Sequence, residues 1–113
     1  MRARATQSVC EFVGVAPSTP APGSKLGIAL QTLGQIPVNG MRVPPEGDTN
    51  GWYIWCGVEL SDAEDFYSAL HIEHIGRYLP LVSEYLSLPP GYRFLIDGEN
   101  YEDVWFDVRL LEV

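Results

Sequence analysis

The clearest pattern in the chain is a run of large apolar side chains at residues 52–56, which read Trp-Tyr-Ile-Trp-Cys. Aromatic and β-branched residues favour strands, and a strand points successive side chains to opposite faces. Both faces of this segment are apolar. We therefore expect a central strand that is covered on both sides, or a core strand whose second face forms a binding surface.

A hairpin is predicted near the C-terminus. Residues 92–96 and 102–108 are rich in strand-forming side chains, and residues 97–100, Asp-Gly-Glu-Asn, supply the turn between them. Residues 8–15 have a similar composition, with Glu11 as their only charge, and they predict a further short strand.

Apolar side chains at three- and four-residue spacing predict helices in two other regions. The first is a short helix over residues 25–33, with Ser24 as its N-cap. The second is a pair of short helices at about residues 73–79 and 81–87, separated at Pro80, which cannot continue the first helix.

Prolines and glycines mark residues 16–23 as a connector and residues 35–51 as a long, turn-rich loop. A chain of 113 residues suits one domain and is too short for two good cores. We expect an N-terminal strand and Pro-rich connector over residues 1–23, followed by one domain over residues 24–113. The expected fold is α+β: a mostly antiparallel sheet of about four strands, with short helices packed on one face.

Charge is distributed unevenly along the chain, which carries a net charge of −8. Residues 1–42 have a net charge of +3 and residues 43–113 a net charge of −11, and residues 43–76 contain no lysine or arginine. Such a surface repels nucleic acid and anionic membranes and attracts basic partners, although acidity can also serve solubility alone. We expect a cytoplasmic protein with reduced thiols and no signal peptide, nucleic-acid partner or membrane partner.

Two acidic segments are candidates for partner binding. The loop at residues 44–52 combines turn residues with Glu46, Asp48 and the large aromatic Trp52, a mixture that suits recognition, although an ordinary connection would fit it equally well. The second segment is a loop with three carboxylates, Asp62, Glu64 and Asp65. These carboxylates lack the spacing of a calcium loop, so they form either a docking patch for a basic protein or a solvated loop.

Two histidines, His71 and His74, stand three residues apart and could share one face of a helix. They would need carboxylates to complete a metal site, and the alternative is that they are ordinary structural side chains. No complete catalytic set or cofactor motif is present, so we expect a binding protein without a cofactor and not an enzyme. The alternatives are a small metal-dependent enzyme or ligand-binding domain that uses the two histidines and the acidic loop, and a structural or oligomerisation domain.

Four segments together resemble a family of small bacterial immunity-protein domains of polymorphic toxin systems. The segments are Leu-Gly-Gln-Ile-Pro-Val-Asn-Gly (33–40), Asn-Gly-Trp-Tyr-Ile-Trp-Cys-Gly (50–57), Leu-Pro-Pro-Gly-Tyr-Arg-Phe-Leu-Ile (88–96) and Tyr-Glu-Asp-Val-Trp-Phe-Asp (101–107). The likeness covers about residues 24–113 and is weaker over residues 1–23. The resemblance implies an intracellular protein that binds a cognate toxin domain and blocks its active site, and it assigns no catalytic residue. The toxin-binding surface is then predicted to include Glu46, Asp48, Trp52, Asp62, Glu64 and Asp65.

Overall fold

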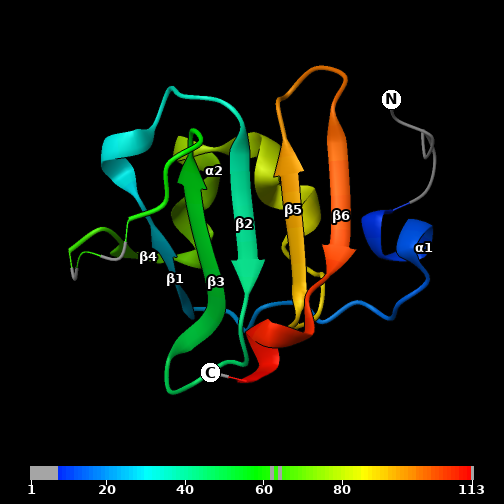
Figure 1. Ribbon diagram of the computed structural model, residues 1–113. Helices are drawn as coiled ribbons and strands as arrows, with labels where there is room; N and C mark the ends of the chain where they lie inside the picture. Colours follow the sequence, from blue (N-terminus) through cyan, green and yellow to red (C-terminus); the bar gives the residue numbers. More distant parts are fainter. Residues whose placement is uncertain (1–7, 62, 64, 113) are drawn as a thin grey trace.

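The structure, a computed structural model, describes residues 8–61, 63 and 65–112. These residues form one six-stranded sheet in the order β4-β1-β3-β2-β5-β6 (Figure 1). The strands are β1 (Lys25–Ile28), β2 (Val38–Arg42), β3 (Thr49–Cys56), β4 (Ser68–His71), β5 (Tyr92–Ile96) and β6 (Glu102–Phe106). The strands β1 and β3 are parallel, and the other neighbours are antiparallel. The prediction of a mostly antiparallel sheet of about four strands is therefore wrong, because the sheet is mixed and larger.

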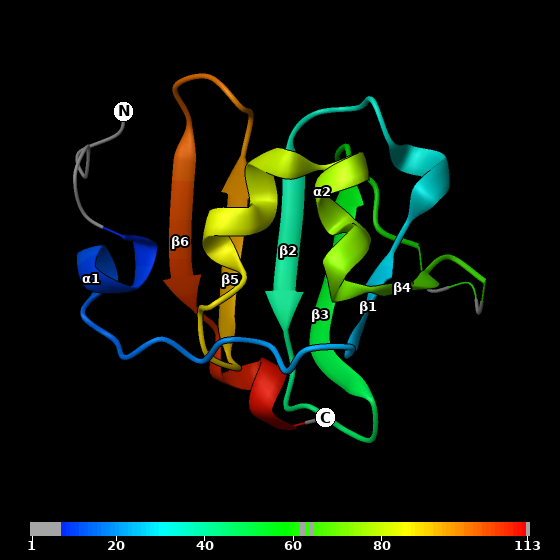
Figure 2. The same ribbon diagram turned by 180° about the vertical axis from the view of Figure 1, so that it is seen from behind.

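Short helices cover one face of this sheet. The helical elements are α1 (Val9–Val13), η1 (Leu30–Thr32), η2 (Ile72–His74), α2 (Ile75–Tyr78), η3 (Pro80–Tyr85) and η4 (Val108–Glu112). Figure 2 shows α2 and the segment after it lying across the strands, with the connector that follows α1 running over the same face. None of the described helices crosses the middle of the opposite face, which is turned toward the viewer in Figure 1. Among the described residues, no helix is long and apolar enough to span a bilayer.

The core lies between the sheet and these helices. Trp52, Ile54 and Phe94 project from the strands and are almost completely buried, as are Val82 and Tyr85 of η3. The rings of Tyr85 and Phe94 are stacked, with centroids 4.8 Å apart. Burying one large apolar side chain contributes about 1.5–3 kcal/mol, so this layer is a principal source of stability.

The strand predicted at residues 8–15 is wrong, because this segment forms the helix α1. The Ser8 side chain accepts a hydrogen bond from the Glu11 backbone amide, and the Glu11 side chain accepts one from the Ser8 amide. This reciprocal pair is a capping box, and Gly14 ends the helix in the left-handed conformation. Val9 and Cys10 are buried in the core, so α1 packs against the rest of the described chain.

The helix predicted at residues 25–33 is also wrong, because the strand β1 occupies its first half and the single turn η1 follows. Leu26 and Ile28 are buried, whereas their neighbours are partly exposed, which is the alternation of a strand. Gly27 leaves space for the ring of Tyr53, since a Cβ atom at this position would lie 2.8 Å from it. The absence of a side chain at Gly27 therefore lets Tyr53 and Tyr67 pack close to this position.

Residues 35–51 were expected to form a loop, but they contain β2 and the start of β3. Gly40 in β2 is covered by the ring of Phe94, and a Cβ atom there would lie 2.2 Å from the ring. The hairpin prediction is confirmed as β5 and β6, and the helix break at Pro80 is confirmed because α2 ends at Tyr78. The strand predicted at residues 52–56 is confirmed as the second part of β3.

Arg42, at the end of β2, is a buried cation that joins distant segments. Its guanidinium donates hydrogen bonds to the carbonyl oxygens of Ser18 at 2.6 Å, Leu88 at 2.8 Å and Asn50 at 2.9 Å. The guanidinium carbon also lies 5.7 Å from the ring centroid of Trp52, within the range of a cation–π contact. Burial lowers the pKa of Arg42. The side chain thus ties the connector before β1 to the centre of the sheet.

Candidate functional site

The sheet face opposite the helices carries a continuous row of side chains. Strand pairing places Tyr53 of β3 next to Met41 of β2, Met41 next to Arg93 of β5, and Arg93 next to Trp105 of β6. Each of these four residues is partly exposed. Because side chains alternate along a strand, the residues next to them in sequence point the other way, toward the helices.

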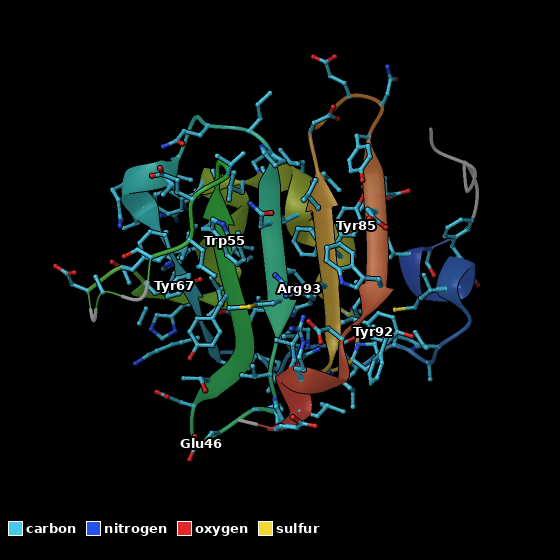
Figure 3. All side chains as sticks on the ribbon, viewed as in Figure 1. Glu46, Trp55, Tyr67, Tyr85, Tyr92 and Arg93 are labelled. Atoms are coloured by element: carbon cyan, nitrogen blue, oxygen red, sulfur yellow. The ribbon has the colours of Figure 1, made fainter. Side chains whose placement is uncertain are left out.

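A second row lies beside the first one on the same face. It consists of Trp55, Asn39, Leu95 and Asp103, which are likewise neighbours across four strands. Trp55 is buried beneath Phe66 and Met41, while Asp103 is exposed at the far end of the row. We call the two rows together the open face, and Figure 3 views the molecule from this side. Tyr, Trp, Met and Arg are the residue types that are enriched in protein–protein interfaces.

Tyr67 covers one end of the open face, next to the strand β4. Its ring lies edge-on to the rings of Tyr53 and Phe66, with centroid distances of 4.9 Å in both pairs. Its hydroxyl oxygen is buried and has no hydrogen-bond partner among the residues that the structure describes. Burial, and secondarily Tyr53, raise the pKa of Tyr67 to about 12, while the nearby Arg93 acts in the opposite direction. A buried hydroxyl without a partner is costly, so it requires an explanation.

Arg93 forms the second polar centre of the open face. Its guanidinium carbon lies 5.5 Å from the ring centroid of Trp105, and one terminal nitrogen is 3.2 Å from Asp107. Asp107 also accepts hydrogen bonds from the Arg109 side chain at 3.0 Å. The bonds from Arg109, and then from Arg93, hold the pKa of Asp107 well below its usual range. Arg93 is therefore held in place by a carboxylate that stays ionised.

The Nε atom of Arg93 is also buried, and no described residue is its hydrogen-bond partner. In the part of the chain that the structure describes, it shares this property only with the hydroxyl of Tyr67. Both atoms belong to side chains of the same sheet face (Figure 3). Native proteins leave few buried polar groups unpaired, so a pair of them on one face marks that face as a candidate contact surface.

A cavity of about 1030 Å³ opens beside the open face. Its lining residues come from η1 and the loop after it, from β2 and β3, and from the loop between β3 and β4: Gln31, Thr32, Gln35, Met41, Cys56, Glu59, Leu60, Ser61, Phe66 and Tyr67. Glu59 is the acidic side chain among them. Burial raises the pKa of the Cys56 thiol, which favours its neutral form. The described lining thus combines polar, apolar and aromatic side chains with the carboxylate of Glu59.

The first predicted binding loop is divided between the surface and the core. Glu46 and Asp48 are exposed in the turn between β2 and β3, and Asp48 lies 3.2 Å from the amino group of Lys25. Figure 3 shows Glu46 at the tip of this turn, away from Trp55 and Tyr67. Trp52 is 1% exposed and donates a hydrogen bond to the carbonyl oxygen of Leu86 at 2.9 Å, so its ring belongs to the core.

The second predicted loop is described only in part. Asp62 and Glu64 lie outside the described residues, while Asp65 is exposed and directly precedes Phe66. The described neighbours Glu59, Leu60 and Ser61 line the cavity. This loop therefore leads from the end of β3 to the aromatic cluster that bounds the open face.

His71 and His74 are close to each other, but they do not share a helix. His71 ends β4 and His74 ends η2, and their ring centroids are 6.0 Å apart. One ring nitrogen of His71 lies 3.3 Å from the carbonyl oxygen of Gly23. Among the described residues, no group of three or more His, Cys, Asp or Glu side chains is arranged to hold a metal ion.

The residues that sequence reasoning missed are Arg93, Trp105 and Tyr67. Alternation places Arg93 on the same face of its strand as Leu95, and Trp105 on the same face as Asp103. The pairing of Arg93 with Trp105 in the hairpin then brings all four side chains to one face. The pattern does not reveal which face the helices cover. Tyr67 had no comparable signal, since residues 66–70 are too short and mixed for a periodic pattern.

Comparison with known protein families identifies a related domain. A protein-family model described as an Imm33-like domain matches residues 5–107. The match spans the whole sheet and the open face, and it also includes most of the N-terminal segment, where the resemblance noted from the sequence was weaker. The comparisons with curated proteins and with solved structures find no match.

Proposed function

Because the chain belongs to the Imm33-like domain family, we propose that it is an immunity protein that binds a cognate toxin domain and blocks its activity. The family description itself points to an immunity role. The toxin, the surface that binds it and the way it is inhibited are parts of the proposal.

The observation that carries the proposal is the open face. It presents Tyr53, Arg93 and Trp105 on one side of a sheet that is covered by helices on the other side. Tyr, Trp and Arg residues supply most of the strong contacts in protein interfaces. A hydrogen-bonded sheet also holds such side chains at fixed positions, which lowers the entropy cost of binding.

The unpaired atoms on this face fit the same role. A partner can supply a hydrogen-bond acceptor to the Nε atom of Arg93 and a hydrogen-bonding group to the hydroxyl of Tyr67, neither of which has a partner within the described residues. Pairing a buried polar group on binding gives both affinity and specificity, because a wrong partner leaves the group unpaired.

Charge favours a basic toxin. Asp103 is exposed on the open face, and Asp65 and Glu59 are exposed at its β4 side. The region from residue 43 onward has a net charge of −11. An acidic surface speeds association with a basic protein, and many toxin domains that act on nucleic acid are basic. A basic toxin synthesised in the cytoplasm would be inhibited there, so we place the protein in that compartment.

The experiment is a kinetic binding measurement with the toxin encoded by a neighbouring gene. The association rate should fall as salt is raised, and Asp103→Lys should slow association, whereas Glu99→Lys in the β5–β6 turn should change it little. Reversing Asp62, Glu64 and Asp65 together should also slow association. If Asp103→Lys and Glu99→Lys behave alike, the open face is not the surface that the toxin approaches.

A further inference from the structure

The cavity beside the open face has walls that suit a flat cation. Phe66 and Tyr67 are in edge-on contact at 4.9 Å, and Met41 packs against the same aromatic cluster. A guanidinium group is planar and weakly hydrated, so it packs on aromatic rings more readily than an ammonium group does. These walls favour arginine over lysine.

The polar groups of the cavity favour the same ligand. The carboxylate of Glu59 lines the cavity and can accept hydrogen bonds from a guanidinium group. Tyr67 also lines the cavity, and its buried hydroxyl has no hydrogen-bond partner among the described residues. The thiol of Cys56 adds no charge at neutral pH, because burial raises its pKa.

We propose that this cavity receives an arginine side chain of the bound toxin, whose guanidinium packs against the rings of Phe66 and Tyr67 and donates hydrogen bonds to Glu59. This inference rests on the proposed function, since the toxin supplies the arginine. It adds a defined specificity pocket next to the flat open face. Met41 belongs to both surfaces, so one partner can contact them together.

The first test uses the isolated protein and a small probe. N-acetyl-arginine N-methylamide is titrated while amide chemical shifts are followed by NMR, and the uncharged citrulline analogue serves as control. The arginine probe should shift the signals of Gln31, Cys56 and Tyr67 in a saturable way, and the citrulline probe should bind at least about tenfold more weakly. Equal shifts with both probes, or none with either, would overturn the inference.

The second test uses the complex and two matched variants. Glu59→Gln removes the carboxylate that the described residues supply to the cavity, and Glu99→Gln makes the same change in a distant turn. Both positions are exposed, so both variants should fold. We expect Glu59→Gln to weaken toxin binding about tenfold and Glu99→Gln to leave it unchanged. Toxin binding that survives Glu59→Gln overturns the cavity inference and leaves the immunity role intact. A wild-type chain that binds no toxin overturns the immunity role itself.

Discussion

Replacing Tyr67 by phenylalanine should stabilise the protein. The substitution removes the hydroxyl, which is buried without a hydrogen-bond partner in the described part of the chain, and keeps the ring that contacts Tyr53 and Phe66. In the unfolded chain this hydroxyl is hydrogen-bonded to water, so folding pays a desolvation cost that phenylalanine avoids. Most single substitutions destabilise a protein, which makes the predicted sign a demanding test.

The magnitude follows from the burial of one hydroxyl. Leaving such a group unsatisfied costs about 1–3 kcal/mol, and the side chain is only partly buried, so we expect a gain of about 1 kcal/mol in the free energy of unfolding. With the urea dependence typical of small proteins, this gain raises the midpoint of unfolding by about 0.3–1 M.

Tyr85→Phe is the matched control. Its hydroxyl is also buried, but it donates a hydrogen bond to the carboxylate of Glu102. Removing it leaves that carboxylate with one hydrogen bond fewer, so this variant should lose about 1–3 kcal/mol. The same chemical change thus has opposite signs at the two positions.

The assay is urea unfolding at neutral pH, repeated at alkaline pH. The pKa of Tyr67 is raised from its ordinary value of 10 to about 12, so the unfolded chain ionises at lower pH than the folded one, and the free energy of unfolding falls as the pH rises through this interval. The wild-type protein should therefore lose more stability across this interval than Tyr67→Phe does. If Tyr67→Phe is less stable than the wild type at neutral pH, the hydroxyl has a partner and the reasoning is refuted.

Three further predictions concern the fold and the support of the open face. Gly40→Ala should lower the free energy of unfolding by about 1–3 kcal/mol, because its Cβ atom would lie 2.2 Å from the Phe94 ring. In the control Gly76→Ala, the Cβ atom meets no described atom within 4 Å, so thermal unfolding should show a neutral or stabilising effect. Arg42→Met should lower the free energy of unfolding by about 3 kcal/mol, since several carbonyl oxygens lose their donor; a loss below about 1 kcal/mol in urea unfolding would contradict this. Asp107→Asn should reduce the pH dependence of the melting temperature. Because the pKa of this carboxyl is depressed in the folded state, its contribution to stability is present above the unfolded pKa near 4 and is lost as the pH falls further. If the melting temperatures of both proteins fall equally steeply below pH 4, the ion pair with Arg93 does not stabilise the fold.

Local patterns sufficed where one segment could be interpreted on its own. The β5–β6 hairpin has a polar turn with Gly98 between two strand-forming runs, and residues 52–56 are almost all aromatic or β-branched. The break at Pro80 follows from the missing amide hydrogen of proline. Each of these features is fixed by neighbours within a few residues.

In the two segments whose secondary structure was predicted wrongly, the sequence contains features of both a helix and a strand. Residues 8–15 have the composition of a strand, but Ser8, Glu11 and Gly14 cap a helix, and these caps decided the outcome. In residues 25–33 the apolar positions fit a helical stripe, yet Leu26 and Ile28 also alternate as in a strand. Pairing with β3 and β4 favours the strand, and such pairing is a tertiary effect that propensity does not include.

The strand β2 could not be predicted from its own residues, because two of them fit a strand only through contacts with residues far away in the sequence. Gly40 weakens a strand in isolation, but the Phe94 ring occupies the space that a side chain would need. Arg42 would be unsuitable for a core, but carbonyl groups from three other segments satisfy its donors.

The candidate site had the same difficulty. Trp52 and Trp105 are both aromatic residues within predicted strands, and only the position of the helices decides that Trp52 is in the core and Trp105 on the open face. The acidic character of the surface could be predicted from composition alone. The aromatic surface that it borders required the register of four strands.

The most direct test of toxin binding at the open face compares the affinity of the toxin for two variants, one at a tryptophan and one at a tyrosine. Trp105→Ala removes an aromatic side chain from the open face, and Tyr78→Ala removes one that is 44% exposed on α2, on the helical side. After unfolding curves show that both variants are folded, calorimetry should give a dissociation constant at least about tenfold weaker for Trp105→Ala and unchanged for Tyr78→Ala. Unchanged binding by Trp105→Ala, with binding lost in Tyr78→Ala, would contradict the account and place the toxin on the helical side.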